Sequence, residues 1–223
     1  MLVLAVDTSS PTVAAAVCDV VDGDVRLRSE RSETADNRHG ERLAPLTVAS
    51  LRDAGIAPDQ LEAVVVGVGP APFTGLRVGI VTARALSDAL GIPAYGVCSL
   101  DGIAHRFTTD VGSFAVVTDA RRKQVYWGLY DERGARIDGP ELAPPDELAD
   151  RLRGRTTDVV GAGALKYTAA FDGFTVREGD PSPRAVDLVW CVDFTRQPSV
   201  LAPMYLRRPD AQPPGRPKAV TPA

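Results

Sequence analysis

The chain has 223 residues, of which 44% are hydrophobic and 24% are charged, and its formal net charge is −4 at pH 7. This composition is typical of a globular protein built as one large domain or as two compact halves. The negative net charge excludes a protein that binds nucleic acid through its overall electric field. A role with RNA would therefore be local, or would depend on a partner.

Three widely separated cysteines, Cys18, Cys98 and Cys191, lie in apolar surroundings. We expect them to be reduced core residues of a cytoplasmic protein. The N-terminal run reaches Asp7 after a few apolar residues and has no positively charged start, which predicts no signal peptide. No uncharged apolar run approaches the roughly 18 residues of a membrane span, so we expect no membrane association.

The first half predicts a mixed α/β unit. Apolar runs separated by turn residues indicate strands, and stretches with helical periodicity indicate helices that Gly55 and Gly91 end. Ser99 is expected to cap the last of these helices. The predicted strands are 2–6, 12–20, 25–29, 63–68 and 93–97, and the predicted helices are 37–54, 74–90 and 99–107.

A second strand-rich cycle begins near Phe114 and indicates a duplicated architecture without a residue-level repeat. We therefore expect an N-terminal subdomain at 1–107 and a C-terminal subdomain at 108–206. The Pro-rich tail at 207–223 has almost no large apolar residue, so we expect it to be disordered or to lie along a surface. The predicted strands of the second half are 115–118, 125–130, 134–137 and 159–160, and its predicted helices are 145–152 and 183–194.

The segment GPAPFTGLRVG at 69–79 stands between a predicted strand and a predicted helix, where many proteins bind phosphate. Pro70 and Pro72 lack the backbone N–H groups that such a loop needs, and no Lys followed by Ser or Thr ends it. We interpret the segment as a rigid turn that begins a buried helix.

Asp7 ends the first predicted strand and is followed by Thr8 and Ser9. A carboxylate in this place could position a phosphate and a metal-bound water, or it could stabilise the hairpin as an Asx turn. Both interpretations stay open. Asp119 is the matching residue of the second half, but long cations at 121–123 follow it. We therefore do not expect a complete two-hairpin phosphate clamp.

The remaining polar residues predict no catalytic centre of a common kind. His39 and His105 do not have the spacing of a metal-binding pair, and no C-x-x-C motif is present, so we expect no metal site. No residue is identified as a nucleophile. We interpret the cations at 121–123 as solvated surface charge, with a phosphate contact as the alternative.

The predicted helix at 74–90 carries charge only at Arg77, Arg84 and Asp88, which form one narrow stripe. Its remaining surface is apolar or small, so it must be covered on more than one side. Leu76, Ile80 and Leu86 are expected to face the sheet. We expect the small residues Gly75, Gly79 and Ala83 to form a ridge that another helix can approach closely, and we infer a helical interface with another protein.

Six segments taken together resemble the bacterial TsaB (YeaZ) family. They occur in order along nearly the whole chain, although the loop at 69–79 departs from the usual GPGSFTGLR at Ala71 and Pro72. The resemblance implies an α/β, actin-like ATPase (ASKHA, RNase H-like) fold of two subdomains, each with a mixed sheet and flanking helices. The segments are MLVLAVDTSS, RHGERLAP, GPAPFTGLRVG, GIPAYGVCSL, DARRKQVYW and the final Tyr205-Leu206-Arg207.

The resemblance also implies a non-catalytic subunit that helps to form N6-threonylcarbamoyladenosine at position 37 of tRNAs that read ANN codons. Such a chain binds the catalytic subunit TsaD directly and TsaE through the complex. It has no cofactor of its own, because ATP and metal are expected on partner subunits. Contact with tRNA would be indirect or minor, and a homodimer of the free chain through the same helices stays open.

Carried over to this sequence, the partner-facing helices begin near His39 and at Thr74. Asp7, Thr8, Ser9 and Asp119 would form a vestigial nucleotide site. The alternative function is an independent ATP-dependent kinase or phosphohydrolase of the same fold that uses Asp7. The expected interface residues are His39, Leu43, Leu46, Gly75, Arg77, Gly79 and Ala83.

Overall fold

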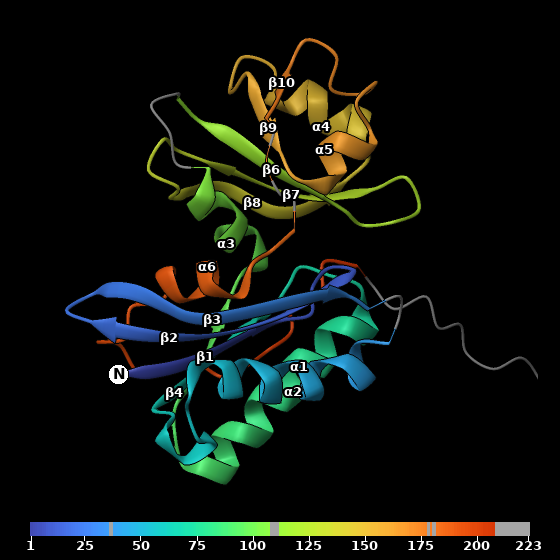
Figure 1. Cartoon of the computed structure of the whole chain (residues 1–223). Helices are drawn as coiled ribbons and strands as arrows, with labels where there is room; N and C mark the ends of the chain where they lie inside the picture. Colours follow the sequence, from blue (N-terminus) through green and yellow to red (C-terminus); the bar gives the residue numbers. More distant parts are fainter. Residues whose placement is uncertain (36–37, 108–111, 178, 180–181, 208–223) are drawn as a thin grey trace, which may run out of the picture.

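The computed structural model describes residues 1–35, 38–107, 112–177, 179 and 182–207. These residues form two halves, each built around one five-stranded sheet (Figure 1). This confirms the expected arrangement of two mixed sheets with flanking helices.

The first sheet has the strand order β3-β2-β1-β4-β5. β1 pairs antiparallel with β2 and parallel with β4, so the central strand joins the hairpin to the parallel part. Alternate residues of β1 therefore point to opposite faces of the sheet, and both faces are buried. The strands are β1 Leu2–Asp7, β2 Thr12–Val21, β3 Asp24–Thr34, β4 Ala63–Gly67 and β5 Ala94–Val97.

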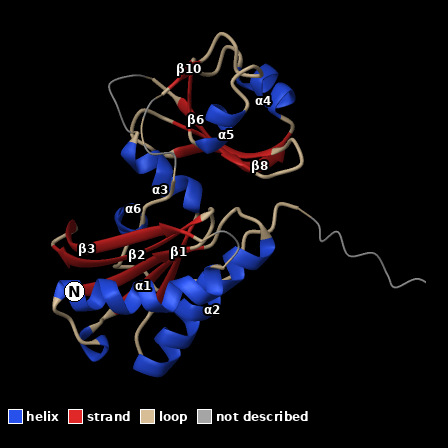
Figure 2. Cartoon of the chain, turned by 45° about the vertical axis from the view of Figure 1, so that its right-hand side comes forward, coloured by secondary structure: helices blue, strands red, loops and turns tan. Residues whose placement is uncertain are grey.

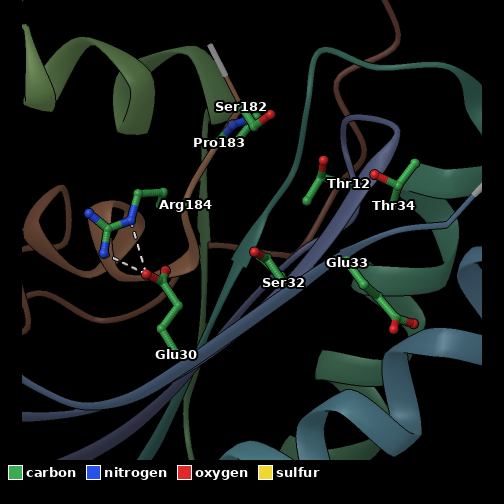
Figure 3. A pocket seen from close by; sticks show the side chains of 9 residues that line it. Thr12, Glu30, Ser32, Glu33, Thr34, Ser182, Pro183 and Arg184 are labelled. Atoms are coloured by element: carbon green, nitrogen blue, oxygen red, sulfur yellow. Dashed lines mark hydrogen bonds and ion pairs between the residues drawn. The ribbon is translucent and has the colours of Figure 1, made fainter. Parts of the chain in front are cut away.

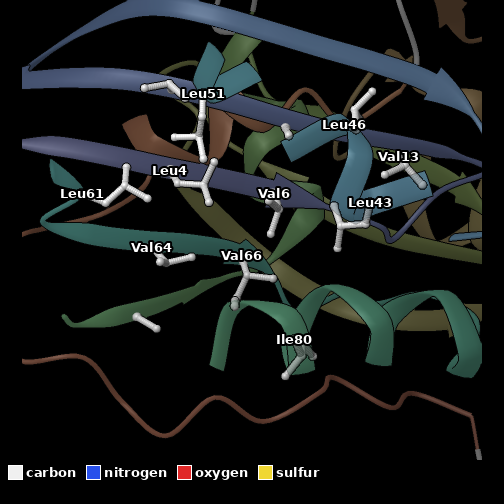
Figure 4. Packing of buried hydrophobic residues seen from close by; sticks show 14 of the residues in the cluster. Leu4, Val6, Val13, Leu43, Leu46, Leu51, Leu61, Val64, Val66 and Ile80 are labelled. Carbon is white, nitrogen blue, oxygen red and sulfur yellow. The ribbon is translucent and has the colours of Figure 1, made fainter. Parts of the chain in front are cut away.

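Helices α1 (His39–Ala54) and α2 (Phe73–Leu90) cover one face of this sheet. Figure 4 shows Leu4, Val6 and Ile80 within this layer of buried side chains. Both helices end at a glycine in the left-handed region, as the sequence predicts, and a short 3-10 turn, η1 (Pro58–Gln60), follows α1. The opposite face is covered by α6 (Ala185–Trp190), which packs on Val3 and Ala5.

The second sheet has the strand order β10-β9-β6-β7-β8, with α4 and α5 on one face and α3 on the other. Figure 2 shows α4 and α5 on the far side of this sheet from the first half, and α3 between the halves. Its elements are β6 Phe114–Asp119, β7 Val125–Tyr130, β8 Arg136–Ala143, β9 Asp158–Val160, β10 Thr175–Val176, α3 Ser99–Arg106, α4 Pro145–Leu152 and α5 Ala162–Lys166.

Helices α3 and α6 pack against each other between the two sheets. Gly102 makes this approach possible, because a Cβ built at Gly102 would lie 2.8 Å from Leu188 Cδ2. The Nε atom of Arg106 lies 2.7 Å from Asp187 Oδ2, and both side chains are largely buried. The contact between the halves therefore combines close packing of α3 on α6 with a buried ion pair.

Two expectations about the chain's organisation are wrong. Helix α6 and Leu201 pack with the first half rather than with the second, because α6 covers the first sheet and Leu201 packs against the core of the same half. Ser99 does not cap α3; its hydroxyl donates to Asp7 instead. The predicted helix at 183–194 is shorter, and residues 36–37 and 208–223 lie outside the described residues.

We predict that Gly102→Ala lowers the free energy of unfolding by about 1–3 kcal/mol. The new methyl group would press on Leu188, which is completely buried. Urea unfolding of the full chain measures the change. Gly40→Ala is the matched control, because its Cβ would meet only Val78 Cγ2 at 4.0 Å and alanine favours a helix. An unchanged stability of Gly102→Ala would contradict the close contact of α3 with α6.

Candidate functional site

The turn between β1 and β2 is held by the buried carboxylate of Asp7, which is only 1% exposed. Asp7 Oδ1 accepts hydrogen bonds from the Ser9 N–H at 2.8 Å and from the Ser9 hydroxyl at 2.7 Å. Asp7 Oδ2 accepts one from the Ser99 hydroxyl at 2.9 Å. Both carboxylate oxygens are thus engaged within the chain, and the arrangement is an Asx turn.

Gly67 at the end of β4 leaves the space that the Asp7 carboxylate occupies. A Cβ at Gly67 would lie 1.9 Å from Asp7 Oδ2 and 2.6 Å from Ser99 Oγ. Burial raises the pKa of Asp7 above its ordinary value, while hydrogen bonds from Ser9 and Ser99 and the nearby His39 oppose that rise. The carboxyl group of Asp7 is therefore enclosed by the fold rather than presented at the surface.

Thr8 connects the same turn to α2. Its hydroxyl donates to the Gly75 carbonyl at 2.8 Å and accepts from the Gly79 N–H at 3.1 Å. A Cβ at Gly79 would lie 2.5 Å from Thr8 Oγ1, and one at Gly75 would lie 2.9 Å from the Thr8 carbonyl oxygen. The two glycines are therefore needed for the close approach of α2 to the β1–β2 turn.

His39 ties the beginning of α1 to the same place. Its Nε2 lies 2.8 Å from the Ser10 carbonyl oxygen, and a Cβ at Gly75 would lie 3.2 Å from that nitrogen. The first residues of both helices thus meet at the β1–β2 turn, and this position explains the small residue at 75.

The outer surfaces of α1 and α2 lie side by side on one face of the molecule (Figures 1 and 2). Val48 on α1 and Val81 on α2 are each 65% exposed, the largest exposure of any big aliphatic side chain in the described part of these helices. Ala44 and Ala85 beside them are exposed as well. We call this set, Ala44, Val48, Val81 and Ala85, the outer helical face.

Comparison with known proteins connects this geometry to a family. Residues 31–158 match the family model described as TsaD, tRNA N6-adenosine threonylcarbamoyltransferase. An uncharacterized protein of Mycobacterium tuberculosis is 44% identical over 95% of this chain and 94% of its own length. A protein of Bacillus subtilis named tRNA threonylcarbamoyladenosine biosynthesis protein TsaB is 34% identical over 68% of this chain and 65% of its own length.

Solved structures agree. A Pseudomonas aeruginosa protein described as similar to the peptidase YEAZ superposes with a TM-score of 0.72 at 26% identity, covering 92% of this chain and 99% of that one. YeaZ from Pseudomonas aeruginosa gives a TM-score of 0.68 at 26% identity, covering 84% and 88% of the two chains.

This chain belongs to the TsaB (YeaZ) family. Its two mixed sheets with flanking helices have the α/β architecture that the resemblance to this family implies.

Within this TsaB-family chain, most of the expected interface residues do not lie on the outer helical face. Leu43, Leu46, Gly79 and Ala83 are buried in the first half. Arg77 alone among them is fully on the surface. The small ridge therefore serves packing inside the chain, which corrects the expectation that it is presented to a partner. Helical spacing explains the difference. Gly79 and Ala83 stand three and seven residues after Leu76, so they lie on the same sheet-facing side of α2 as Leu76.

The expected second carboxylate, Asp119, belongs to a separate network. It accepts from Lys166 Nζ at 2.6 Å, from the Tyr167 hydroxyl at 3.2 Å and from the Arg121 N–H at 3.0 Å. All these partners lie in the second half, whereas Asp7 is bonded by Ser9 in its own turn and by Ser99 at the start of α3. The two carboxylates are thus each satisfied locally. Among the described residues no group of three or more His, Cys, Asp or Glu side chains could hold a metal ion.

A polar pocket of about 270 Å³ lies between the β2–β3 hairpin and the segment before α6 (Figure 3). Arg184 donates to Glu30 across its floor at 2.5 and 2.9 Å. No motif in the sequence predicts this pocket, since its walls come from segments about 150 residues apart. Its lining residues are Thr12, Ala14, Glu30, Ser32, Glu33, Thr34, Ser182, Pro183 and Arg184.

Other expectations concern the cysteines and the membrane. Cys18 and Cys98 are buried and Cys191 is exposed, and all three are free thiols, so only two are core residues. Within the described part of the chain, no helix has both the length and the apolar character needed to cross a bilayer.

We predict that Asp7→Asn changes the pH dependence of stability. Because the folded-state pKa of Asp7 is raised, the wild-type carboxyl favours the folded state most at pH values below its ordinary pKa. That contribution is lost as the pH rises through the folded pKa, by about 1.4 kcal/mol for each unit of the shift. Urea unfolding between about pH 4 and pH 8 should show the wild type losing stability relative to Asp7→Asn. A difference that does not vary with pH would contradict this assignment.

Proposed function

We propose that this chain is a scaffold and activator subunit in the formation of N6-threonylcarbamoyladenosine at position 37 of tRNAs that read ANN codons. In this role it binds TsaD directly and meets TsaE through the complex. The proposal is supported by the TsaD family match, which covers 31–158, and by the relatives named for threonylcarbamoyladenosine biosynthesis in Bacillus subtilis and Escherichia coli.

The outer helical face is the observation that carries the proposal. Val48 and Val81 are large aliphatic side chains that remain 65% exposed, although the inner faces of both helices are fully packed. The alanines beside them leave the helix backbones open to close approach by another helix. An exposed apolar strip on two adjacent helices fits helix-to-helix docking better than contact with a polar ligand.

The state of the acidic residues supports a subunit without catalysis of its own. Asp7 is buried with both oxygens engaged, and Thr8 uses its hydroxyl to hold α2. Neither residue is presented to a nucleotide. This geometry supports our assignment of ATP and metal to partner subunits over an independent kinase or phosphohydrolase that uses Asp7.

We predict that Val48→Asp and Val81→Asp each weaken the binding of TsaD at least tenfold, because a charge would be buried in an apolar contact. Pull-down and calorimetry against purified TsaD measure the loss. Ile137→Asp is the matched control: Ile137 is 56% exposed on β8, in the other half of the molecule, and its replacement should leave TsaD binding unchanged. Equal affinity of wild type and both helical variants would reject the outer helical face as the docking surface.

The activator role is tested by reconstitution of tRNA threonylcarbamoylation with and without this chain. We expect tRNA threonylcarbamoylation to require this chain. Val48→Asp and Val81→Asp should reduce the yield of modified tRNA in proportion to their loss of affinity for TsaD. Full activity of TsaD, TsaE and the adenylate-forming enzyme without this chain would overturn the proposal. ATP turnover by the purified chain that disappears in Asp7→Ala would instead establish the kinase or phosphohydrolase alternative.

A further inference from the structure

The last described segment crosses from the first half of the molecule to the second. We call residues 200–207 the strap. The Met204 N–H donates to the Val68 carbonyl at 2.8 Å, which anchors the strap to the loop after β4. Three residues later, Arg207 Nη2 bonds to Gln124 Oε1 and lies 3.5 Å from the Arg121 carbonyl oxygen. The strap thus places a guanidinium against the β6–β7 turn.

The middle of the strap holds an exposed aromatic and a cation. Tyr205 is 37% exposed, and its hydroxyl accepts from Arg77 Nε at 2.6 Å. Its ring lies 4.6 Å from that of Phe73, and the Arg77 guanidinium lies 5.5 Å from the Tyr205 ring centre. Arg77 is therefore fixed at the surface near the beginning of α2, in contact with an aromatic face.

The β6–β7 turn presents three more cations. Arg121, Arg122 and Lys123 are exposed, and their φ angles are 61°, 53° and 55°. Glycine, asparagine and aspartate are the residues that usually occupy this left-handed region. Here three long basic side chains occupy it, and the turn is closed by the Gln124 N–H bonding to the Arg121 carbonyl at 3.1 Å. A requirement for turn formation alone does not account for this choice.

The strap contacts both α2 and the β6–β7 turn, through Tyr205 on Arg77 and through Arg207 on Gln124, and so connects these groups. We call Arg77, Arg121, Arg122, Lys123 and Arg207 the cationic stripe. The carboxylate at the base of the turn, Asp119, is already paired with Lys166. A stripe of five cations with one exposed aromatic stands out on a chain whose net charge is −4.

We propose that the cationic stripe binds the phosphate backbone of RNA, and that Tyr205 provides a stacking surface for an unpaired base. Guanidinium groups suit phosphate oxygens because they donate in a planar fork, and exposed aromatics stack on single-stranded bases. A single phosphate would need an enclosing cradle, whereas an extended row of cations drawn from three segments fits a polyanion. The identification of that polyanion as RNA rests on the proposed function. The proposal replaces the expectation that contact with tRNA is indirect or minor.

The test uses the full chain, alone and with TsaD, and an unmodified transcript of an ANN-reading tRNA. Fluorescence anisotropy at several salt concentrations gives the affinity and its salt dependence. Arg122→Glu with Lys123→Glu should weaken binding at least tenfold and lower the salt slope by about two ionic contacts. Arg133→Glu with Arg153→Glu is the control, since it makes the same charge change at exposed positions elsewhere in the second half.

A fold loss as large in the control as in the turn variant would overturn the proposal, because it would show only an effect of overall charge. Equal binding of a DNA duplex of the same length would also overturn the proposal. The same holds if the wild-type chain, alone or with TsaD, shows no measurable binding of tRNA. Tyr205→Leu should weaken binding of the transcript more than binding of inorganic polyphosphate, because only the transcript offers a base to stack. If the turn variant keeps its affinity for TsaD but loses tRNA, both proposals stand; if wild type binds tRNA but not TsaD, the scaffold proposal alone fails.

Discussion

The hydroxyl of Thr8 is the contact on which the first half depends. By bonding to the Gly75 carbonyl and the Gly79 N–H, it fixes the first turns of α2 against the strand end that also carries Asp7. The two glycines are the counterpart of that contact, since any side chain there would push the helix away. Once α2 is fixed, α1 has a neighbour to pack on, and the outer surfaces of the two helices lie side by side.

Much of this half could be predicted from sequence because its signals are local. Alternating apolar runs and turn residues define β1 to β5, and Gly55 and Gly91 end the two helices where expected. The spacing of Gly79 and Ala83 after Leu76 also predicts locally that both face the sheet, although their four-residue interval by itself suggests a ridge for a second helix. The hydrogen bond from Ser99 to Asp7 could not be predicted from local sequence, because the two residues are 92 positions apart.

The boundary between the halves shows why contacts between distant residues are hard to predict from sequence. The sequence predicts the exposed cations of the β6–β7 turn, but the surroundings of the turn depend on Arg207, which is 83 residues from its partner Gln124. Likewise, α6 has a helical pattern that says nothing about which sheet it covers. Topology alone assigns it to the first half, where it buries the face of β1 opposite α1 and α2.

This return of the chain has a consequence for how the protein is made. During synthesis, the face of the first sheet that carries Val3 and Ala5 has no cover until α6 leaves the ribosome, and α6 begins at Ala185, whereas β5 ends at Val97. The first half therefore cannot complete its core before the second half has been translated, and the two halves mature together rather than in succession. A fragment that ends at residue 107 would expose that apolar face to water, so the natural unit of folding is the whole chain up to the strap.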